Sequence, residues 1–166
     1  HWGNYRLIFE QRRGADLVTF PLGNTAALAN AVAGRSKAIV LLNTPNNPTG
    51  YSPSVEEAHE IAAALTTAAA AGTDLVVICD DAYFGLFYEA ETFKESLFSL
   101  LAHAHERILA VKIDGATKEE FAWGMRIGFV TIAGRGLTAD HHEAFIRKVM
   151  GSIRSSISNC SRIAQS

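Results

Sequence analysis

The chain has 166 residues, of which 48% are hydrophobic and 19% charged, and its formal net charge is -2. This is the composition of a globular domain with a sizeable core, and it excludes a disordered chain. The charge gives no reason to expect nucleic acid or an anionic membrane as partner, and the apolar runs are too short to span a bilayer. Two cysteines without a disulfide or metal-binding pattern favour a cytoplasmic location.

Continuous apolar runs predict five β-strands. They cover residues 16–22, 37–43, 75–81, 108–115 and 126–133. Because the runs do not alternate with polar residues, we expect both faces of the sheet to be covered.

Helices are predicted between these strands. Ser52 before Pro53 is expected to begin one, and residues 95–103 to form another. Apolar stripes at helical spacing support the first helix and predict a last one. They are Val55, Ala58, Ala62, Leu65 and Ala69, and then Phe145, Val149, Ile153 and Ile157.

The alternation of strands and helices predicts a mostly parallel, doubly wound α/β sheet with helices on both faces. One connection differs, because only about eleven residues lie between Gly115 and Arg126, fewer than a parallel crossover needs. The last strand is therefore expected to run antiparallel. We interpret the abrupt start at His1, with no initiator Met, as a sign of a piece of a larger domain.

Polar side chains follow the predicted strand ends. "NTPNNPTG" (43–50) follows one strand, "DDAYFG" (80–85) ends the next, and Lys118 follows the third. Because the last strand runs backwards, Arg126 belongs to the same edge. Ligands of open α/β sheets bind beyond the carboxyl ends of the strands. We therefore expect an amide, a carboxylate, a phenol, an amine and a guanidinium to surround one ligand.

This set of side chains suits pyridoxal 5'-phosphate. A lysine in a partly dry pocket is a nucleophile toward an aldehyde. An arginine fork binds a phosphate, and a carboxylate suits a pyridine nitrogen that must stay protonated.

Four motifs in this order resemble those of the aspartate-aminotransferase-like (class I/II, fold type I) enzymes. They are "WGN", "NNPTG", "DDAY" and "TKEEFAWGMRIG", and the likeness runs from "HWGNY" to "SNCSR". It implies a pyridoxal-phosphate-dependent aminotransferase that is a homodimer and acts on an amino acid and a 2-oxo acid. It also implies that residues 1–166 are part of the large cofactor-binding domain, without the family's N-terminal part and its C-terminal small domain.

The resemblance assigns roles to single residues. Lys118 would carry the cofactor as a Schiff base and move the proton, and Asp80 would meet the pyridine nitrogen. Tyr83 and Asn47 would bind the phenolic oxygen.

Further residues match binding positions of the family. Thr117 and Arg126 would hold the phosphate, and Trp2 would stack on the ring. Arg154, in "RSSISN" (154–159), would bind a side-chain carboxylate of the substrate.

The chain also departs from the family. Gly115 stands where the family often has a phosphate-binding serine, and the family's Gly/Ser-rich helix start is absent. The family's sheet has seven strands, and this sequence predicts five. We therefore expect that residues 1–166 alone do not turn over a substrate.

Plainer interpretations exist for each residue taken singly. Lys118 and Arg154 could be solvated surface residues, and Arg126 could cap a strand. Asp80 and "PNNPTG" could form turns, and Trp2 could serve in packing. Lys112 is the rival amine, but it lies inside a strand, pointing away from the edge. No metal is expected, because the adjacent His141 and His142 diverge by about 100° on a helix. The alternative functions are β-elimination or decarboxylation on the same cofactor, or a non-catalytic truncated domain.

Overall fold

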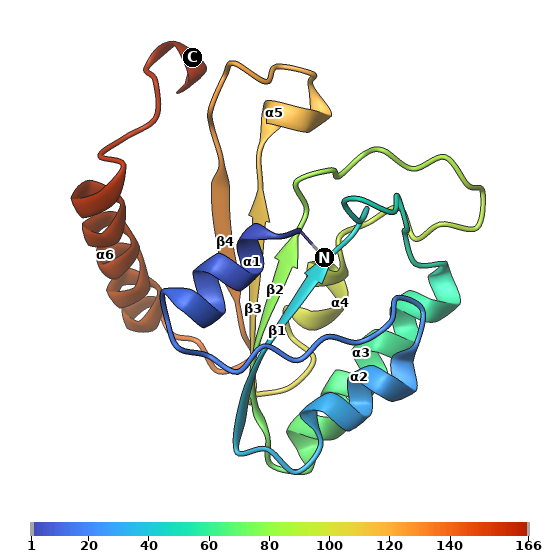
Figure 1. Cartoon of the computed structure of the whole chain (residues 1–166). Coiled ribbons are helices and arrows are strands. Elements are labelled where there is room, and N and C mark those ends of the chain that lie inside the picture. The colour runs from blue at the N-terminus through green and yellow to red at the C-terminus, as the bar shows by residue number, and fades with distance from the viewer. Residues whose placement is uncertain (1, 166) are drawn as a thin grey trace.

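A mixed four-stranded sheet forms the centre of the computed structural model, which describes residues 2–165 (Figure 1). The strands are β1 (Lys37–Asn43), β2 (Asp74–Asp80), β3 (Ile108–Asp114) and β4 (Phe129–Ala133). They lie side by side in chain order. β1, β2 and β3 are parallel, and β4 runs antiparallel to β3. The predicted mostly parallel sheet with one antiparallel strand is confirmed.

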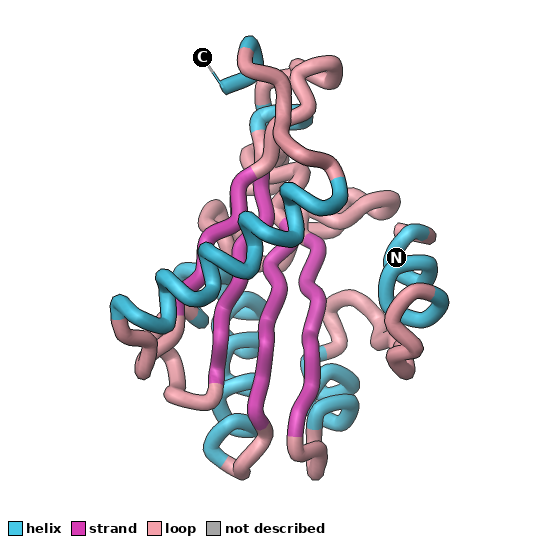
Figure 2. Tube along the Cα trace, turned by 90° about the vertical axis from the view of Figure 1, so that its left-hand side faces the viewer, coloured by secondary structure: helices cyan, strands magenta, loops and turns pink. Residues whose placement is uncertain are grey.

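The helices lie on both faces of this sheet (Figure 2). They are α1 (Asn4–Arg6), η1 (Leu7–Gln11), α2 (Thr25–Val32), α3 (Val55–Ala70), α4 (Leu97–Leu101), α5 (Ala116–Glu119), α6 (Ala139–Ser156) and η2 (Ile163–Gln165). The connections between the parallel strands carry α3 and α4, which pack against one face, whereas α6 passes over the opposite face. No described helix is long and apolar enough to cross a membrane.

The two faces are buried to different degrees. Leu75, Val77 and Cys79 alternate along β2 toward α3 and α4, and each is at most 2% exposed. On the other face Ile39 is 60% exposed, and none of the described residues of α6 is buried. The prediction that both faces would be covered therefore holds for the positions of the helices, but only one face forms a packed core.

The prediction of a strand over residues 16–22 is wrong. This segment has no regular secondary structure, and within residues 2–165 no strand pairs with the open edge of β1. Val18 is 49% exposed, so the apolar run packs against too little of the core to be held in a sheet. An apolar run becomes a strand only where a neighbouring backbone accepts its hydrogen bonds.

Several boundaries also shift. The strands predicted over residues 75–81 and 108–115 are Asp74–Asp80 and Ile108–Asp114. The helix predicted from Ser52 begins instead after Ser54, because Ser54 forms a capping box with Glu57. The Glu57 backbone N–H donates to Ser54 Oγ at 3.2 Å, and the Ser54 backbone N–H donates to Glu57 Oε2 at 2.7 Å. The helix predicted over residues 95–103 is the shorter α4. The last strand begins at Phe129, which leaves Arg126 in the preceding loop.

Candidate functional site

Asp80 is the last residue of β2, and donors from two directions hold its carboxylate. The Tyr5 phenol, from α1, donates a short hydrogen bond to Oδ2. The backbone N–H of Ala82 donates to Oδ1 at 3.2 Å. Burial, followed by the hydrogen bond to Asp80 and the charge of Asp80, raises the pKa of Tyr5. The phenol therefore keeps its proton and remains a donor.

The turn after β1 is fixed by Asn43, a buried residue that the sequence did not single out. Asn43 Nδ2 donates to the backbone oxygen of Asp80 at 3.1 Å, and its Oδ1 accepts the backbone N–H of Asn47 at 3.0 Å. The amide of Asn47 then donates to the phenolic oxygen of Tyr83 at 3.3 Å. Asn43 thus ties the turn carrying Asn47 to the strand end carrying Asp80.

Lys118 lies in α5, directly after β3. Its Nζ is 5.3 Å from the centre of the Tyr83 ring, and it forms no ion pair within residues 2–165. The rival Lys112 is different, because its Nζ lies 2.5 Å from a carboxylate oxygen of Asp114. Burial by itself would lower the pKa of Lys112, but the hydrogen bond and charge of Asp114 hold it above the ordinary value. Lys118 is therefore the amine left available at this edge.

The loop after α5 carries the predicted phosphate ligands. Thr117 Oγ1 donates to the backbone oxygen of Met125 at 3.3 Å, which ties the two ends of the loop together. Arg126 is exposed, and its side chain has no hydrogen-bond or ion-pair partner in the part of the chain that the structure describes. This guanidinium is free to bind an anion.

Gly115 lies where the loop passes closest to β4. A Cβ atom at this position would overlap the carbonyl oxygen of Ile127 and lie 3.1 Å from the Cα of Gly128. The backbone therefore leaves no room for the serine that the related motif often carries here. This packing explains the departure from the family pattern.

Of the two remaining predicted residues, Trp2 lies next to a residue that contacts Asp80, and Arg154 does not. The Trp2 ring meets the Tyr5 ring edge-on, with 5.5 Å between centroids, so Trp2 lies beside the partner of Asp80. Arg154 lies near the end of α6, where its Nη1 donates to Ser158 Oγ at 2.9 Å. The structure gives Arg154 no contact with the cluster.

Asp81, next to Asp80, is buried at 3% exposure. Its Oδ2 has no hydrogen-bond partner among the described residues. Burial raises the pKa of Asp81 to about 6, although a hydrogen bond with Ser96 and the charge of Lys112 lower it in part. Asp81 continues the alternation of Leu75, Val77 and Cys79 toward the buried face, and this alternation is the sequence signal that separates it from Asp80.

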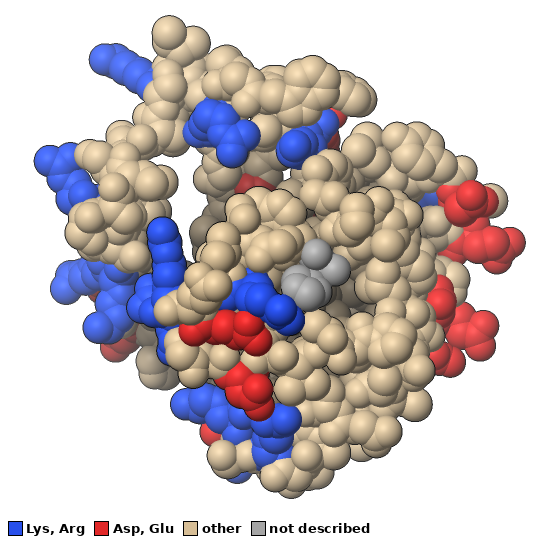
Figure 3. Space-filling view, in the orientation of Figure 1, with Lys and Arg blue, Asp and Glu red and all other residues tan. Residues whose placement is uncertain are grey.

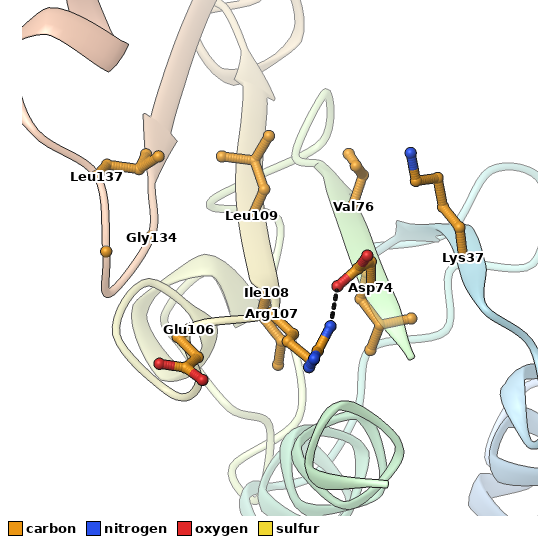
Figure 4. Close-up of a pocket in the computed structure, with 11 residues that line it drawn as sticks. Lys37, Asp74, Val76, Glu106, Arg107, Ile108, Leu109, Gly134 and Leu137 are labelled. Atoms are coloured by element: carbon orange, nitrogen blue, oxygen red, sulfur yellow. Dashed lines mark hydrogen bonds and ion pairs between the residues drawn. The ribbon is translucent and has the colours of Figure 1, made fainter. Parts of the chain in front are cut away.

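Cavities lie at both edges of the sheet. A cavity of about 260 Å³ at the carboxyl edge is bordered by Asn47 and Tyr83. A larger one, of about 330 Å³, lies at the amino edge, where Arg107 pairs with Asp74 at 2.7 Å (Figure 4). Figure 3 shows a further hollow in the surface between α6 and the rest of the molecule, with basic side chains around it.

Comparison with known proteins identifies the family. The whole chain, residues 1–166, matches the family model of aminotransferase class I and II. The chain belongs to this family. It is 31% identical over 105 residues to an aspartate aminotransferase of Bacillus sp. (strain YM-2), a match that covers 61% of this chain and 24% of that relative.

Solved structures of aminotransferases share the fold. An aminotransferase from Anaerococcus prevotii matches 99% of this chain and 42% of its own length, with a TM-score of 0.84 and 25% identity. An aspartate aminotransferase mutant from Thermus thermophilus matches 92% of this chain and 38% of its own, with a TM-score of 0.64 and 27% identity. The chain thus spans less than half the length of each of these aminotransferases.

Proposed function

We propose that this chain belongs to a pyridoxal-phosphate-dependent aminotransferase that transfers an amino group from an amino acid to a 2-oxo acid. The observation that carries the proposal is the convergence of Asp80, Asn47, Tyr83 and Lys118 at the carboxyl edge of one sheet, in a chain of the class I and II family. The same edge carries Arg126, whose guanidinium has no partner among residues 2–165.

The donor set fits the cofactor group by group. The carboxylate of Asp80 suits a protonated pyridine nitrogen, and the paired Asn47 amide and Tyr83 phenol suit a phenolic oxygen. Arg126 and Thr117 suit a phosphate through charge-assisted hydrogen bonds. These residues would hold the cofactor, with Trp2 against its ring.

The residues then have distinct tasks. The bound cofactor supplies an electron-withdrawing ring that stabilises negative charge at the substrate α-carbon. Lys118 Nζ would hold the cofactor, and its free amine would move the proton at the substrate α-carbon as a general base and acid. Asp80 would face the ring nitrogen and accept its hydrogen bond, which favours the protonated ring.

We also propose that Arg154 binds the side-chain carboxylate of an acidic substrate across the interface of a homodimer. The relative from Bacillus is an aspartate aminotransferase, which supports an acidic donor. Arg154→Ala would then lower the preference for aspartate and glutamate, and an unchanged preference would remove this role. The two free cysteines, Cys79 and Cys160, favour a reducing cytoplasm for the enzyme.

Product analysis separates the proposal from other reactions on the same cofactor. An aminotransferase yields a keto acid and a new amino acid, whereas β-elimination yields ammonia with pyruvate, and decarboxylation yields CO₂.

Covalent labelling tests the proposal directly. The intact protein, loaded with pyridoxal phosphate, is treated with borohydride, and the labelled peptide is mapped. We expect the label on Lys118, because it is the unpaired amine of this edge, and Lys112 serves as the internal control because Asp114 occupies it. A label on Lys112, or none on either lysine, contradicts the assignment.

A further inference from the structure

Lys112 contacts two segments that meet at the carboxyl edge of the sheet. The alternation along β3 places it on the same face as the core residues Ile108 and Ala110, and its side chain is 23% exposed. Its Nζ pairs at 2.5 Å with Asp114, the last residue of β3. The same Nζ lies 5.3 Å from the centre of the Phe84 ring, in the turn after β2. One ammonium thus joins the end of β3 to that turn.

Lys118 contacts the neighbouring residue of the same turn. Its Nζ lies 5.3 Å from the centre of the Tyr83 ring, so two lysines six residues apart lie over two adjacent aromatic residues. The Phe84 ring also meets the Phe87 ring edge-on, with 5.4 Å between centroids. Ammonium groups are attracted to the faces of such rings. The turn is therefore contacted by one lysine that precedes α5 and by another that lies within it.

The helix α5, which carries Lys118, has few other contacts that fix its place. It is one turn long, none of its residues is buried, and its N-cap residue makes no side-chain hydrogen bond. The backbone ladder between β2 and β3 ends before α5, at the hydrogen bond from the Asp81 N–H to the Ile113 oxygen (2.9 Å). The bond from Thr117 to the Met125 oxygen joins α5 only to its own loop. The place of α5 relative to the turn after β2 therefore depends on side-chain contacts.

Carboxylates on both sides of Lys118 face Lys112. Asp114 precedes α5, and Glu119 is the last residue of α5. Burial by itself lowers the pKa of Lys112, but these two carboxylates and Asp81 raise it above the ordinary value. Lys112 therefore keeps its positive charge, which attracts both ends of the short helix. Because the pair with Asp114 is mostly shielded from water, it is stronger than an ion pair on an open surface.

We propose that Lys112 is a positioning residue for Lys118: its ammonium holds the start of α5, through Asp114, against the turn that carries Tyr83. The proposal rests on the proposed function, in which Lys118 is the amine that binds the cofactor. In this role Lys112 acts through Asp114 and Phe84 and does not itself reach the ligand. A structural Lys112 would only add to stability, whereas a positioning Lys112 determines where the Lys118 amine lies in the folded protein.

The test compares the intact protein with Lys112→Met, which keeps an apolar side chain and removes the charge. The first readout needs no cofactor. It is the ¹³C,¹H signal of the Lys118 Cε group in protein with ¹³C-labelled lysine, identified by its loss in Lys118→Met. The Tyr83 ring current displaces this signal in the wild type, and we expect Lys112→Met to move it toward the signals of exposed lysines.

The second readout is the yield of borohydride label on Lys118 at a subsaturating concentration of pyridoxal phosphate. We expect this yield to fall roughly ten-fold in Lys112→Met, as for the loss of one hydrogen bond between charged groups. Lys112→Arg keeps the positive charge and is expected to retain both wild-type readouts. Lys94→Met is the matched control, since it removes an exposed ammonium elsewhere, and is expected to change neither.

Other outcomes overturn the proposal. A wild-type Lys118 signal in folded Lys112→Met, or an equal displacement in Lys112→Arg, refutes the positioning role, whatever happens to stability. If Lys112→Met does not fold, Asp114→Asn breaks the same ion pair from its other side, and an unchanged Lys118 signal there refutes the role equally. Failure of the proposed function gives a different result: the wild type then carries no label on Lys118, although its Cε signal still responds to Lys112→Met.

Discussion

The two edges of this sheet carry similar residue types in different arrangements. At the amino edge Arg107 and Asp74 are about half exposed and satisfy each other as an ion pair (Figure 4). At the carboxyl edge Asp80 is held by two donors, and Lys118 and Arg126 have no carboxylate partner among residues 2–165. Two charges in an ion pair neutralise each other. A charge that is held by neutral donors, or that has no partner, can still bind a charged group of a ligand. Lys112 and Asp114 also form an ion pair at the carboxyl edge. This edge therefore differs from the amino edge in that Lys118 and Arg126 remain without a carboxylate partner among residues 2–165.

Asp80→Ala is the strongest test of whether the charges at the carboxyl edge serve a ligand. We expect cofactor binding to remain in part and kcat to fall tens-fold or more, a loss of at least about 2 kcal/mol of transition-state stabilisation. The charge of Asp80 matters most once the substrate α-proton leaves, so the effect falls on the rate rather than on binding. The measurement is steady-state kinetics of the intact protein with cofactor in excess. A near-normal rate would indicate that Asp81, and not Asp80, meets the ring nitrogen.

Asp81→Asn tests a buried carboxyl at the carboxyl edge whose Oδ2 has no hydrogen-bond partner among the described residues. The pKa of Asp81 is about 6 when folded, above its ordinary value of 3.8, so the folded state binds this proton more tightly than the unfolded state. The charged form therefore costs stability above pH 6, and this cost disappears as the pH falls below about 4. Relative to wild type, Asp81→Asn should gain on the order of 2 kcal/mol between pH 4 and pH 7.

Urea unfolding at several pH values measures this difference. Asp16→Asn, which removes an exposed charge, is the matched control for the loss of one carboxylate. A constant difference between Asp81→Asn and wild type across this pH range would contradict the effect of burial.

The sequence predicts the features of this arrangement that depend on residues close together in the chain, and it misses those that depend on distant residues. The strand ends, the antiparallel β4 and the expected edge residues Asn47 and Lys118 follow from runs and spacings that are local in the chain. The contact of Tyr5 with Asp80 could not be predicted, because it joins residues 75 apart through a helix of one turn. The only local sign of this contact is that Tyr5 lies three positions after Trp2.

Other errors have the same origin. Residues 16–22 have the composition of a strand, but strand formation depends on a neighbour that local sequence does not specify. The apolar stripe predicted the last helix, α6, but Ile153 in it is 38% exposed and Ile157, just beyond its end, is 72% exposed. Amphipathic spacing predicts a helix, and it does not say what covers the helix.

Gly115→Ala tests how tightly the carboxyl edge is packed. The new Cβ would overlap the Ile127 carbonyl oxygen, so the backbone on one side must move. We expect a loss of about 1–3 kcal/mol of stability, together with weaker cofactor binding because the displaced loop carries Lys118 and Arg126. Gly124→Ala is the matched control in the same loop, since no atom lies near its added Cβ. Equal melting temperatures for the two variants would contradict the close contact.

Arg107→Ala is expected to have the smallest effect, and it tests the amino edge. Its pair with Asp74 is exposed to solvent, which screens the interaction, so we expect a stability loss below about 1 kcal/mol. A double-mutant cycle with Asp74→Ala isolates the pairwise contribution. Because the pair lies at the opposite end of the strands from Lys118, cofactor binding and turnover should stay at wild-type levels. Loss of turnover in Arg107→Ala, with stability preserved, would show that the paired edge also serves the reaction and would remove the distinction between the two edges.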